Sequence, residues 1–209
     1  MSSLDPPPQP QNPFSTCRVR PGAIPFQFPP GSSPEQLVER LRANRWWGEV
    51  VGPHGSGKSS LLAALVPALQ QAGCRILHIE LHDGQRTLPI DLAQWRPGGQ
   101  PALVIVDGYE QLSWWRRLLL KQRCRRSGLG LLVTSHKPVG LPHLFSTCTN
   151  LALAEQIVAF LLAGRSLLLG REELEKRFIA HQGDLRELLF DLYDLYERDK
   201  AAQPDAPEA

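Results

Sequence analysis

The chain has no run of apolar residues as long as the roughly 18–20 that a helix needs to cross a bilayer. Its first residues also lack a basic segment followed by an apolar core, so we expect no secretory signal. The net charge is only +2, too small for composition alone to indicate nucleic acid binding. These absences favour a cytoplasmic protein without a membrane partner.

Cysteine is scarce as well. The four cysteines, Cys17, Cys74, Cys124 and Cys148, are widely spaced and include no C-x-x-C pair. This spacing argues against a structural zinc site and against a disulfide framework. We therefore expect buried, reduced thiols.

The 209 residues are enough for one α/β domain with a small appendage, and 42% of them are hydrophobic and 21% charged, as in a folded globular protein. Proline is unevenly distributed, because ten of the nineteen prolines lie in residues 1–34. Proline removes backbone donors and disrupts helices and sheets, so we expect a disordered tail over residues 1–13. A second disordered tail is expected over the polar residues 199–209.

Between the tails, predicted strands alternate with predicted helices. Apolar segments that we interpret as strands lie at residues 47–51, 75–81, 101–106, 129–134 and near 147–153. Three segments have helical periodicity. The first begins at Pro34, after a Ser33 cap, and the other two cover residues 59–72 and about 112–126. The alternation predicts βαβ units and an α/β fold, with a mostly parallel five-stranded sheet covered on both faces.

The strand signal stops near Leu153. Three helical segments follow, at residues 154–162, 171–179 and 184–197, separated by glycines. We expect an α/β core over residues 14–153 and a small helical lid over residues 154–198.

A phosphate-binding pattern lies between the first strand and the next helix. Residues 52–59 read GPHGSGKS and match G-x-x-x-x-G-K-[ST] at every fixed position. Glycines let the backbone N–H groups point at phosphates, and the helix that follows adds the positive end of its dipole. Lys58 would bind the β- and γ-phosphates, and Ser59 would bind Mg²⁺. The expected nucleotide contacts are Gly52, Pro53, His54, Gly55, Ser56, Gly57, Lys58, Ser59 and Ser60.

An acid follows the apolar strand of residues 103–106, about fifty residues after the loop. Because ligands bind at the carboxyl ends of strands in open α/β sheets, Asp107 is the candidate Walker B acid that holds Mg²⁺. Many ATPases place a glutamate next, but this chain has Gly108 there. Glu110 either orients the attacking water or is an acid in the first turn of a helix that the helix dipole stabilises, and the sequence leaves both open.

Together these motifs resemble the additional-strand P-loop ATPases, the AAA+ class and its STAND-like relatives, over about residues 14–197. The segment Asp107–Glu110 is similar to the Asp-Gly-containing Walker B motif of the STAND group. The resemblance implies that Thr134 or Ser135 occupies the sensor-1 position and contacts the γ-phosphate. A polar end to a strand is the other interpretation of these two residues.

The same resemblance implies a sensor-2 arginine. Residues 183–186, GDLR, match G-x-x-R at the start of the third lid helix, so Arg186 would reach the γ-phosphate. Arg186 could equally be a surface charge beside Glu187. No arginine lies between Lys137 and Asn150, where ring-forming members carry a finger, so a hexameric motor is doubtful and the oligomeric state is open.

These features predict an ATP-binding protein that is a Mg²⁺-dependent ATPase and uses its nucleotide state to switch conformation or remodel a partner protein. One alternative is a small-molecule kinase, for which Arg165, Arg171 and Arg177 are available as lid arginines. Another is an adaptor that binds ATP without turnover, which Gly108 after Asp107 motivates.

A basic segment lies outside these motifs. Residues 116–126 hold six Lys or Arg, and Arg117, Lys121 and Arg125 share one helical stripe just after Trp114 and Trp115. The segment fits a nucleic acid surface, an ordinary solvated helix face or a docking site for an acidic partner. Four aromatic residues are candidates for the adenine contact, and none is singled out: Phe26, Phe28, Trp46 and Trp47.

Overall fold

The computed structural model describes residues 12–82, 84–85, 95, 98–163 and 169–202. The chain divides into two compact units. Residues Pro25–Cys148 form the first, called the α/β unit here, and residues up to Ile24 together with those from Thr149 form the second, called the helical unit. Of the tail expected over residues 1–13, residues 1–11 lie outside the described residues, whereas Asn12 and Pro13 are described and buried.

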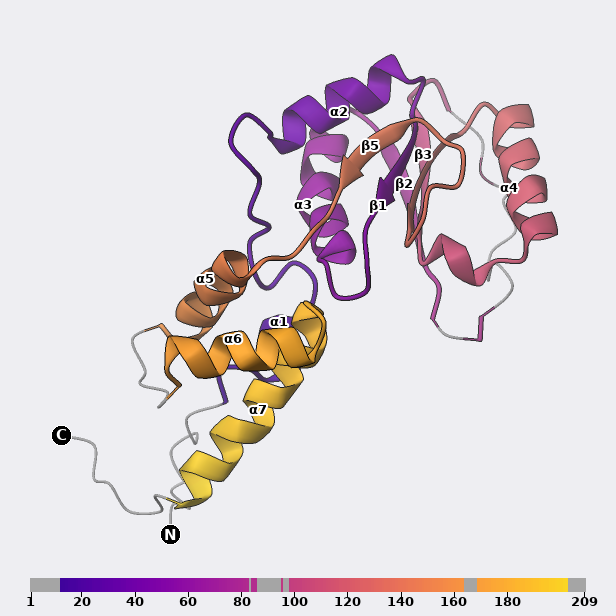
Figure 1. Ribbon diagram of the computed structural model, residues 1–209. Coiled ribbons are helices and arrows are strands. Elements are labelled where there is room, and N and C mark those ends of the chain that lie inside the picture. Colours follow the sequence, from indigo (N-terminus) through magenta and orange to yellow (C-terminus); the bar gives the residue numbers. More distant parts are fainter. Residues whose placement is uncertain (1–11, 83, 86–94, 96–97, 164–168, 203–209) are drawn as a thin grey trace, which may run out of the picture. The chain divides into compact units, whose positions relative to one another are not determined.

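A five-stranded sheet forms the centre of the α/β unit, in the order β2-β3-β4-β1-β5 (Figure 1). All of its neighbouring strands pair in parallel, which confirms the predicted α/β class. The strands are β1 (Trp47–Val51), β2 (Arg75–Glu80), β3 (Ala102–Asp107), β4 (Gly130–Ser135) and β5 (His143–Ser146). One strand, β4, therefore separates the strand before the glycine-rich loop from the strand that ends in Asp107.

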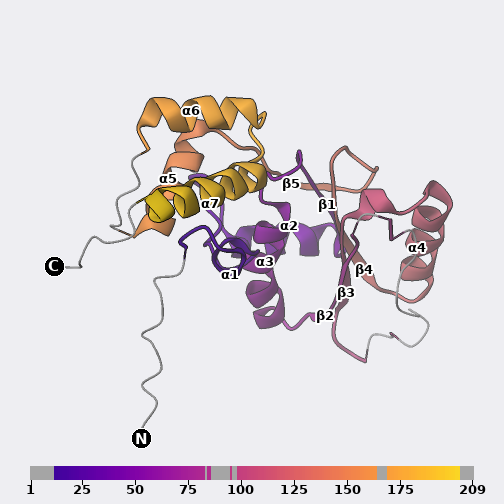
Figure 2. The same cartoon turned by 90° about the horizontal axis from the view of Figure 1, so that it is seen from below.

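Helices cover both faces of this sheet (Figure 2). The helices are α2 (Pro34–Ala43), α3 (Lys58–Gln71) and α4 (Trp114–Arg126), and a short 3-10 turn, η2 (Tyr109–Gln111), follows β3. Side chains alternate along β3: Leu103 and Ile105 pack with α2 and α3, whereas Val104 and Val106 pack with α4. A strand that is buried on both faces is apolar throughout, which is why its sequence gave a clear signal.

The fifth strand was predicted near residues 147–153, and this prediction is wrong. The strand lies at His143–Ser146, and α5 (Leu151–Leu162) already begins within the predicted segment. Asn150 caps this helix, because its side-chain oxygen accepts the N–H of Leu153 at 2.8 Å. A strong N-cap residue thus outweighs the β-propensity of the flanking threonines.

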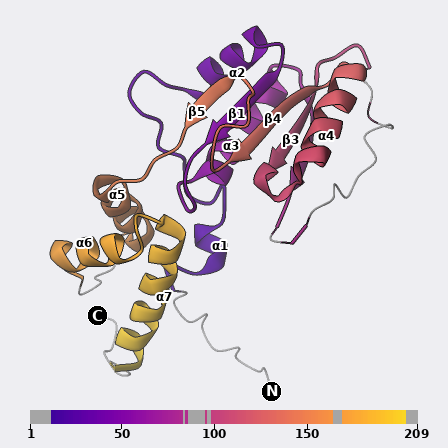
Figure 3. The ribbon, with the colours of Figure 1, turned by 45° about the vertical axis from the view of Figure 1, so that its right-hand side comes forward.

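The helical unit contains α1 (Thr16–Val19), α5, α6 (Arg171–Ala180) and α7 (Leu185–Ala202) (Figure 3). The segment of residues 14–24 packs here, whereas we had expected it in the α/β core: Phe14 is fully buried among α5, α6 and α7. Asn12 is buried too, and its amide donates to the carbonyl oxygen of Tyr193. At the other end, residues 199–202 continue α7 instead of beginning the expected tail.

The cysteines agree only in part with the expectation of buried thiols. Cys74 and Cys124 are buried, Cys17 and Cys148 are exposed, and all four are free. Burial raises the pKa of Cys124 to about 12, so its thiol stays protonated. Within the described ranges, no helix combines the length and the apolar character that a bilayer crossing requires.

An ion-pair cluster links α6 to α7. Arg177 donates to Glu173 at 2.9 Å and to Asp191 at 2.7 Å, and His181 lies 3.4 Å from Asp191. Burial raises the pKa of Asp191, but the hydrogen bonds and charges of Arg177 and His181 outweigh burial and hold this pKa below its usual value. A carboxyl whose pKa is lowered on folding stabilises the fold above its unfolded pKa and loses that contribution as the pH falls through its folded pKa.

We therefore expect Asp191→Asn to lower the free energy of unfolding by about 1–2 kcal/mol at pH 7. The difference from the wild type should shrink as the pH falls below about 4, near the unfolded pKa of an aspartate. Urea denaturation at pH 7 and at a pH below about 4 measures the difference. The exposed Asp194 on the same helix supplies the control Asp194→Asn. An equal loss at both pH values would contradict the role assigned to the pair.

Candidate nucleotide-binding site

The glycine-rich loop of residues 52–57 connects the end of β1 to the start of α3. Gly52 donates its N–H to the carbonyl oxygen of Ser135 at the end of β4, at 3.1 Å. Gly55 and Gly57 have φ values of +61° and +86°, in the left-handed region that residues with a side chain rarely adopt. The backbone curl that the motif predicted is therefore present.

Gly52 has no room for a side chain. A Cβ atom at this position would overlap the side chain of Thr147 and lie 2.7 Å from the Ser56 hydroxyl oxygen. Ser56 donates to the carbonyl oxygen of Pro53 at 2.8 Å and also forms a 2.6 Å hydrogen bond with the Thr147 hydroxyl. Both hydroxyls are buried, so this network fixes the loop from within and from the end of β5. No motif or spacing in the sequence indicated this role of Thr147.

Lys58 lies over the loop that precedes it. Its ammonium group donates to the carbonyl oxygens of Gly52 at 2.8 Å and Pro53 at 2.6 Å. Lys58 is also the first residue of α3, and its N-cap, Gly57, offers no side-chain oxygen to the first turn. The first N–H groups of a helix have no partner within the helix, so a positive charge and a helix N-terminus meet at this loop.

Aromatic side chains occupy two different places in the α/β unit. Phe26 lies beside the loop, with a ring atom 3.6 Å from where a Cβ of Gly57 would be, and packs edge-on against Phe28 at 4.8 Å between ring centroids. Trp46 and Trp47 lie at the opposite end of β1, about 16 Å along the strand from the loop. Phe26 is therefore the aromatic candidate that lies next to the loop.

Asp107 ends β3, and Thr134 of the neighbouring strand β4 holds it. The Thr134 hydroxyl donates to a carboxylate oxygen of Asp107 and accepts the N–H of Gly108 at 2.9 Å. Thr134 is fully buried, and its single proton is used on Asp107. In this structure Thr134 positions the carboxylate, and the contact with the γ-phosphate that the sensor-1 assignment implied stays a prediction.

Gly108 explains why no glutamate follows Asp107. Its φ is +80°, and a Cβ atom would lie 2.6 Å from the carbonyl oxygen of Leu81. Any residue with a side chain would be strained there and would collide with the end of β2. The position at which many ATPases carry a glutamate is thus closed to every residue except glycine.

Glu110, in the turn η2, contacts His136, a histidine to which no motif in the sequence assigned a role. His136, which follows β4, places its Nε2 3.2 Å from Glu110 Oε1. The His136 ring lies 3.7 Å from that of His54 in the glycine-rich loop, measured between centroids. Glu110 Oε2 is buried and has no hydrogen-bond partner within the described part of the chain. His136 is one residue beyond the predicted sensor-1 pair, and that proximity was the only signal for it in the sequence.

Ser135, the other sensor-1 candidate, is also engaged. Its hydroxyl donates to the carbonyl oxygen of Lys137 at 2.7 Å. A cavity of about 320 Å³ opens at this end of β4, beside the loop that follows the strand. Its lining residues are Glu110, Arg117, Ser135, His136, Lys137, Pro138 and Val139.

The sensor-2 candidate Arg186 belongs to the helical unit. Asp184 caps α7, because its carboxylate accepts the N–H groups of Arg186 at 2.9 Å and Glu187 at 3.2 Å. Leu185 and Leu188 are buried, and the Arg186 side chain is exposed. Contact between Arg186 and a phosphate stays a prediction.

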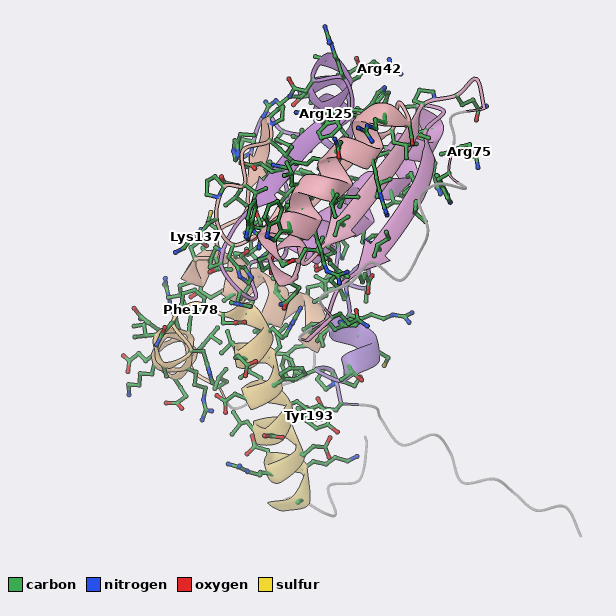
Figure 4. The ribbon with its side chains drawn as sticks, turned by 90° about the vertical axis from the view of Figure 1, so that its right-hand side faces the viewer. Arg42, Arg75, Arg125, Lys137, Phe178 and Tyr193 are labelled. Carbon is green, nitrogen blue, oxygen red and sulfur yellow. The ribbon has the colours of Figure 1, made fainter. Side chains whose placement is uncertain are left out.

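The basic stripe of α4 is committed to its own fold. Arg117 donates to the carbonyl oxygens of Glu110 at 2.7 Å and Leu112 at 2.8 Å. Lys121 donates to a carbonyl oxygen at 2.8 Å. Arg125, which is labelled in Figure 4, places its guanidinium 5.3 Å from the Trp47 ring centroid. The three stripe residues thus contact their own unit, and phosphate contacts would require them to exchange these partners.

Within the described ranges, no three His, Cys, Asp or Glu residues gather into a metal-binding group. Magnesium does not need such a group, because it keeps most of its waters and takes one or two carboxylates together with substrate phosphates. Ser59, in the first turn of α3, and Asp107 are oxygen donors of the type that Mg²⁺ prefers.

Comparison with known proteins adds little. No family model and no curated protein matches the chain. The chain is similar to the solution structure of protein NMB1076 from Neisseria meningitidis, with 20% identity over 90% of this chain and 93% of that chain. The TM-score is 0.29, so this likeness carries no argument about fold or function.

The role of Thr134 is testable through stability. We expect Thr134→Val to lower the free energy of unfolding by about 1–3 kcal/mol, because a buried N–H and a carboxylate each lose their partner. Thr134→Ser keeps the hydroxyl and should lose less. Urea denaturation of the two variants measures the difference, and a serine variant as unstable as the valine variant would show that the hydroxyl is unimportant.

Proposed function

We propose that this chain binds ATP together with Mg²⁺, hydrolyses it, and uses the nucleotide state to change conformation and act on a partner protein. The observation that carries the proposal is the loop at Gly52–Ser60, which leads into the N-terminus of α3. Gly52 has no room for a side chain, two further glycines have left-handed backbone angles, and Lys58 folds over the loop. This arrangement offers backbone N–H groups and a mobile cation to a row of phosphates, as the P-loop of the resembled class does.

Lys58 can exchange its present hydrogen-bond acceptors for phosphate oxygens when a nucleotide binds. Its ammonium group now donates to two neutral carbonyl oxygens of the loop. Phosphate oxygens are charged acceptors, and charge-assisted hydrogen bonds are roughly twice as strong as neutral ones. Binding would therefore draw Lys58 from the loop to the β- and γ-phosphates.

Asp107 and Ser59 are the residues that would hold Mg²⁺, which would neutralise the phosphate charge. The sheet order supports this assignment, because β4 is an additional strand between β1 and β3, the feature for which the resembled class is named. Thr134 keeps the Asp107 carboxylate from swinging away, so the carboxylate does not lose side-chain freedom when the metal binds.

Glu110 is the residue that we assign to the attacking water. Gly108 cannot be a glutamate, so the carboxylate of this site sits two residues further on, in η2. Its Oε1 is held by His136, and its buried Oε2 lacks a hydrogen-bond partner within the described residues. Such an oxygen can accept a proton from water, and positioning together with charge stabilisation supplies most of the rate in phosphoryl transfer.

The chain passes between the two units at two places, and each begins beside the loop. Thr147 contacts Gly52, and two residues later Thr149 donates to the carbonyl oxygen of Gly183 at 2.7 Å, in the turn that leads to Arg186. Phe26 lies beside the loop, and two residues earlier Ile24 packs in the helical unit. These two connections are the covalent links through which a nucleotide-driven switch would act.

The kinase alternative has less support. A lid that neutralises transferred phosphate needs free arginines, yet Arg171 is paired with Glu155 at 2.9 Å and Arg177 with two acids. The third candidate, Arg165, lies outside the described residues. Release of ADP that depends on an added acceptor would favour the kinase over the ATPase.

Binding is tested by Lys58→Ala. We expect this variant to lose measurable affinity for Mg²⁺-ATP, because the phosphates lose their only loop cation, while its thermal unfolding stays within a few degrees of the wild type. Isothermal titration calorimetry measures the affinity, and the exposed Lys176 on α6 supplies the control Lys176→Ala. Unchanged ATP affinity in the Lys58 variant would overturn the proposed function.

Hydrolysis is tested separately by Glu110→Gln. We expect phosphate release to fall on the order of a hundredfold, with the affinity for ATP kept within about threefold, because only the proton acceptor is removed. The exposed Glu187 supplies the control Glu187→Gln. Tight ATP binding with no phosphate release in the wild type would instead identify an adaptor that binds without turnover.

A further inference from the structure

Helix α4 exposes a cluster of large apolar side chains that its fold does not use. Trp114, Trp115, Leu118 and Leu119 are each between 50% and 60% exposed, and we call these four residues the α4 patch. The two indole rings are stacked, with centroids 3.7 Å apart and planes 26° apart. The inner face of the same helix is already packed through Leu120 and Cys124.

Exposed apolar clusters of this kind mark interaction sites more often than they occur by chance. Large apolar side chains stabilise a protein when they are buried, and these four leave half or more of their surface in water. Tryptophan is also enriched among the residues that contribute most to binding between proteins. The α4 patch therefore has the composition of a docking surface.

Positive charge lies beside the patch at one end of the helix. Helix α4 contains no acidic residue, and three of its exposed arginines, Arg116, Arg123 and Arg126, make no hydrogen bond or ion pair within the described part of the chain. At 100° per residue, Gln122 and Arg126 lie within about 20° of the line through Trp115. Along the line through Trp115 the outward face is thus apolar over its first turns and basic over its last turns, about 12 Å further along, with Arg116 on its flank.

This polarity along the helix selects among possible occupants. A helix that lies in a lipid interface has its apolar residues along one line and its basic residues on both flanks. Here Arg126 lies on the same line as Trp115, so a flat insertion would bury a guanidinium with the tryptophan. A single nucleic acid strand would use aromatic stacking and a basic stripe. Arg117 and Lys121 of the stripe already donate to carbonyl oxygens of their own unit, and a nucleic acid would give the two exposed leucines of the patch no role. A second copy of α4 would bring like charges together.

We propose that the α4 patch and the neighbouring arginines dock an acidic segment of a partner protein. The segment would insert apolar side chains around the tryptophan pair and place carboxylates about 12 Å away, opposite Arg123 and Arg126. The inference does not depend on nucleotide binding, and it gives the conformational switch a surface on which a partner could sit.

A displayed library of random 14-residue peptides tests the proposal. Peptides that bind the full wild-type chain are selected, and those that also bind the Leu119→Arg variant are removed. We expect enriched peptides that carry at least two apolar residues and a net negative charge. Fluorescence anisotropy with the recovered peptides should show at least a tenfold loss of affinity for Leu119→Arg and for the milder Leu119→Ser. Arg126→Ser should weaken binding about threefold to tenfold. Added salt should reduce the difference in affinity between this variant and the wild type, because salt screens the charge of Arg126.

Two control variants match these changes elsewhere on the surface. Ile179 is 66% exposed on α6, so Ile179→Arg introduces the same charge at another exposed apolar residue, and Arg198→Ser removes an exposed arginine of α7. Both should bind the peptides like the wild type, and circular dichroism should show the same helix content in every variant.

Several results would overturn the proposal. One is a selection that yields no peptide dependent on Leu119, and another is a set of dependent peptides that are neutral or basic. Binding of vesicles rich in phosphatidylserine, or of a 20-nucleotide DNA strand, that is lost in Leu119→Arg while no peptide binds would assign the surface to a lipid or a nucleic acid. Dimers that dissociate in Leu119→Arg would assign it to a second copy of the chain.

Discussion

The loop between β1 and α3 keeps its shape because residue 52 is a glycine and has no side chain. Thr147, Ser56 and the loop backbone occupy the space that a Cβ would need, so the chain turns tightly at the end of a buried strand. Several neighbouring elements adjoin this turn. Lys58 folds back onto it, α3 starts from it, and the two connections to the helical unit leave from residues that touch it.

Binding and turnover have different physical supports in this site. The binding elements are local, since the loop, Lys58 and Ser59 lie within nine residues of each other. The elements that we propose for turnover come from three separate segments: Asp107 is held by Thr134, Glu110 by His136, and the His136 ring lies tilted against that of His54. The close approach of Leu81 to Gly108 explains why the acid is displaced to η2, and that displacement makes hydrolysis the more demanding claim.

The elements predicted well from the sequence are those whose signal is local. The apolar run of β3, the cap at Ser33 and the glycine spacing of the loop each depend on neighbouring residues. The strand order and the Glu110–His136 contact depend on pairing between distant segments, which no spacing reveals. The fifth strand was misplaced because threonines favour strands, while the Asn150 cap and the helix after it decided the local structure. The basic stripe of α4 had the right period, but its partners were carbonyl oxygens that sequence does not show.

The most direct test of the account follows backbone amide exchange, peptide by peptide, with and without Mg²⁺-ATP. N–H groups that receive phosphates exchange more slowly, because they are bonded and shielded from water. The account predicts slower exchange in residues 55–60, and slower exchange around Asp107 only when Mg²⁺ accompanies the nucleotide. Unchanged exchange in residues 52–60 at an ATP concentration that saturates the protein would contradict the central claim.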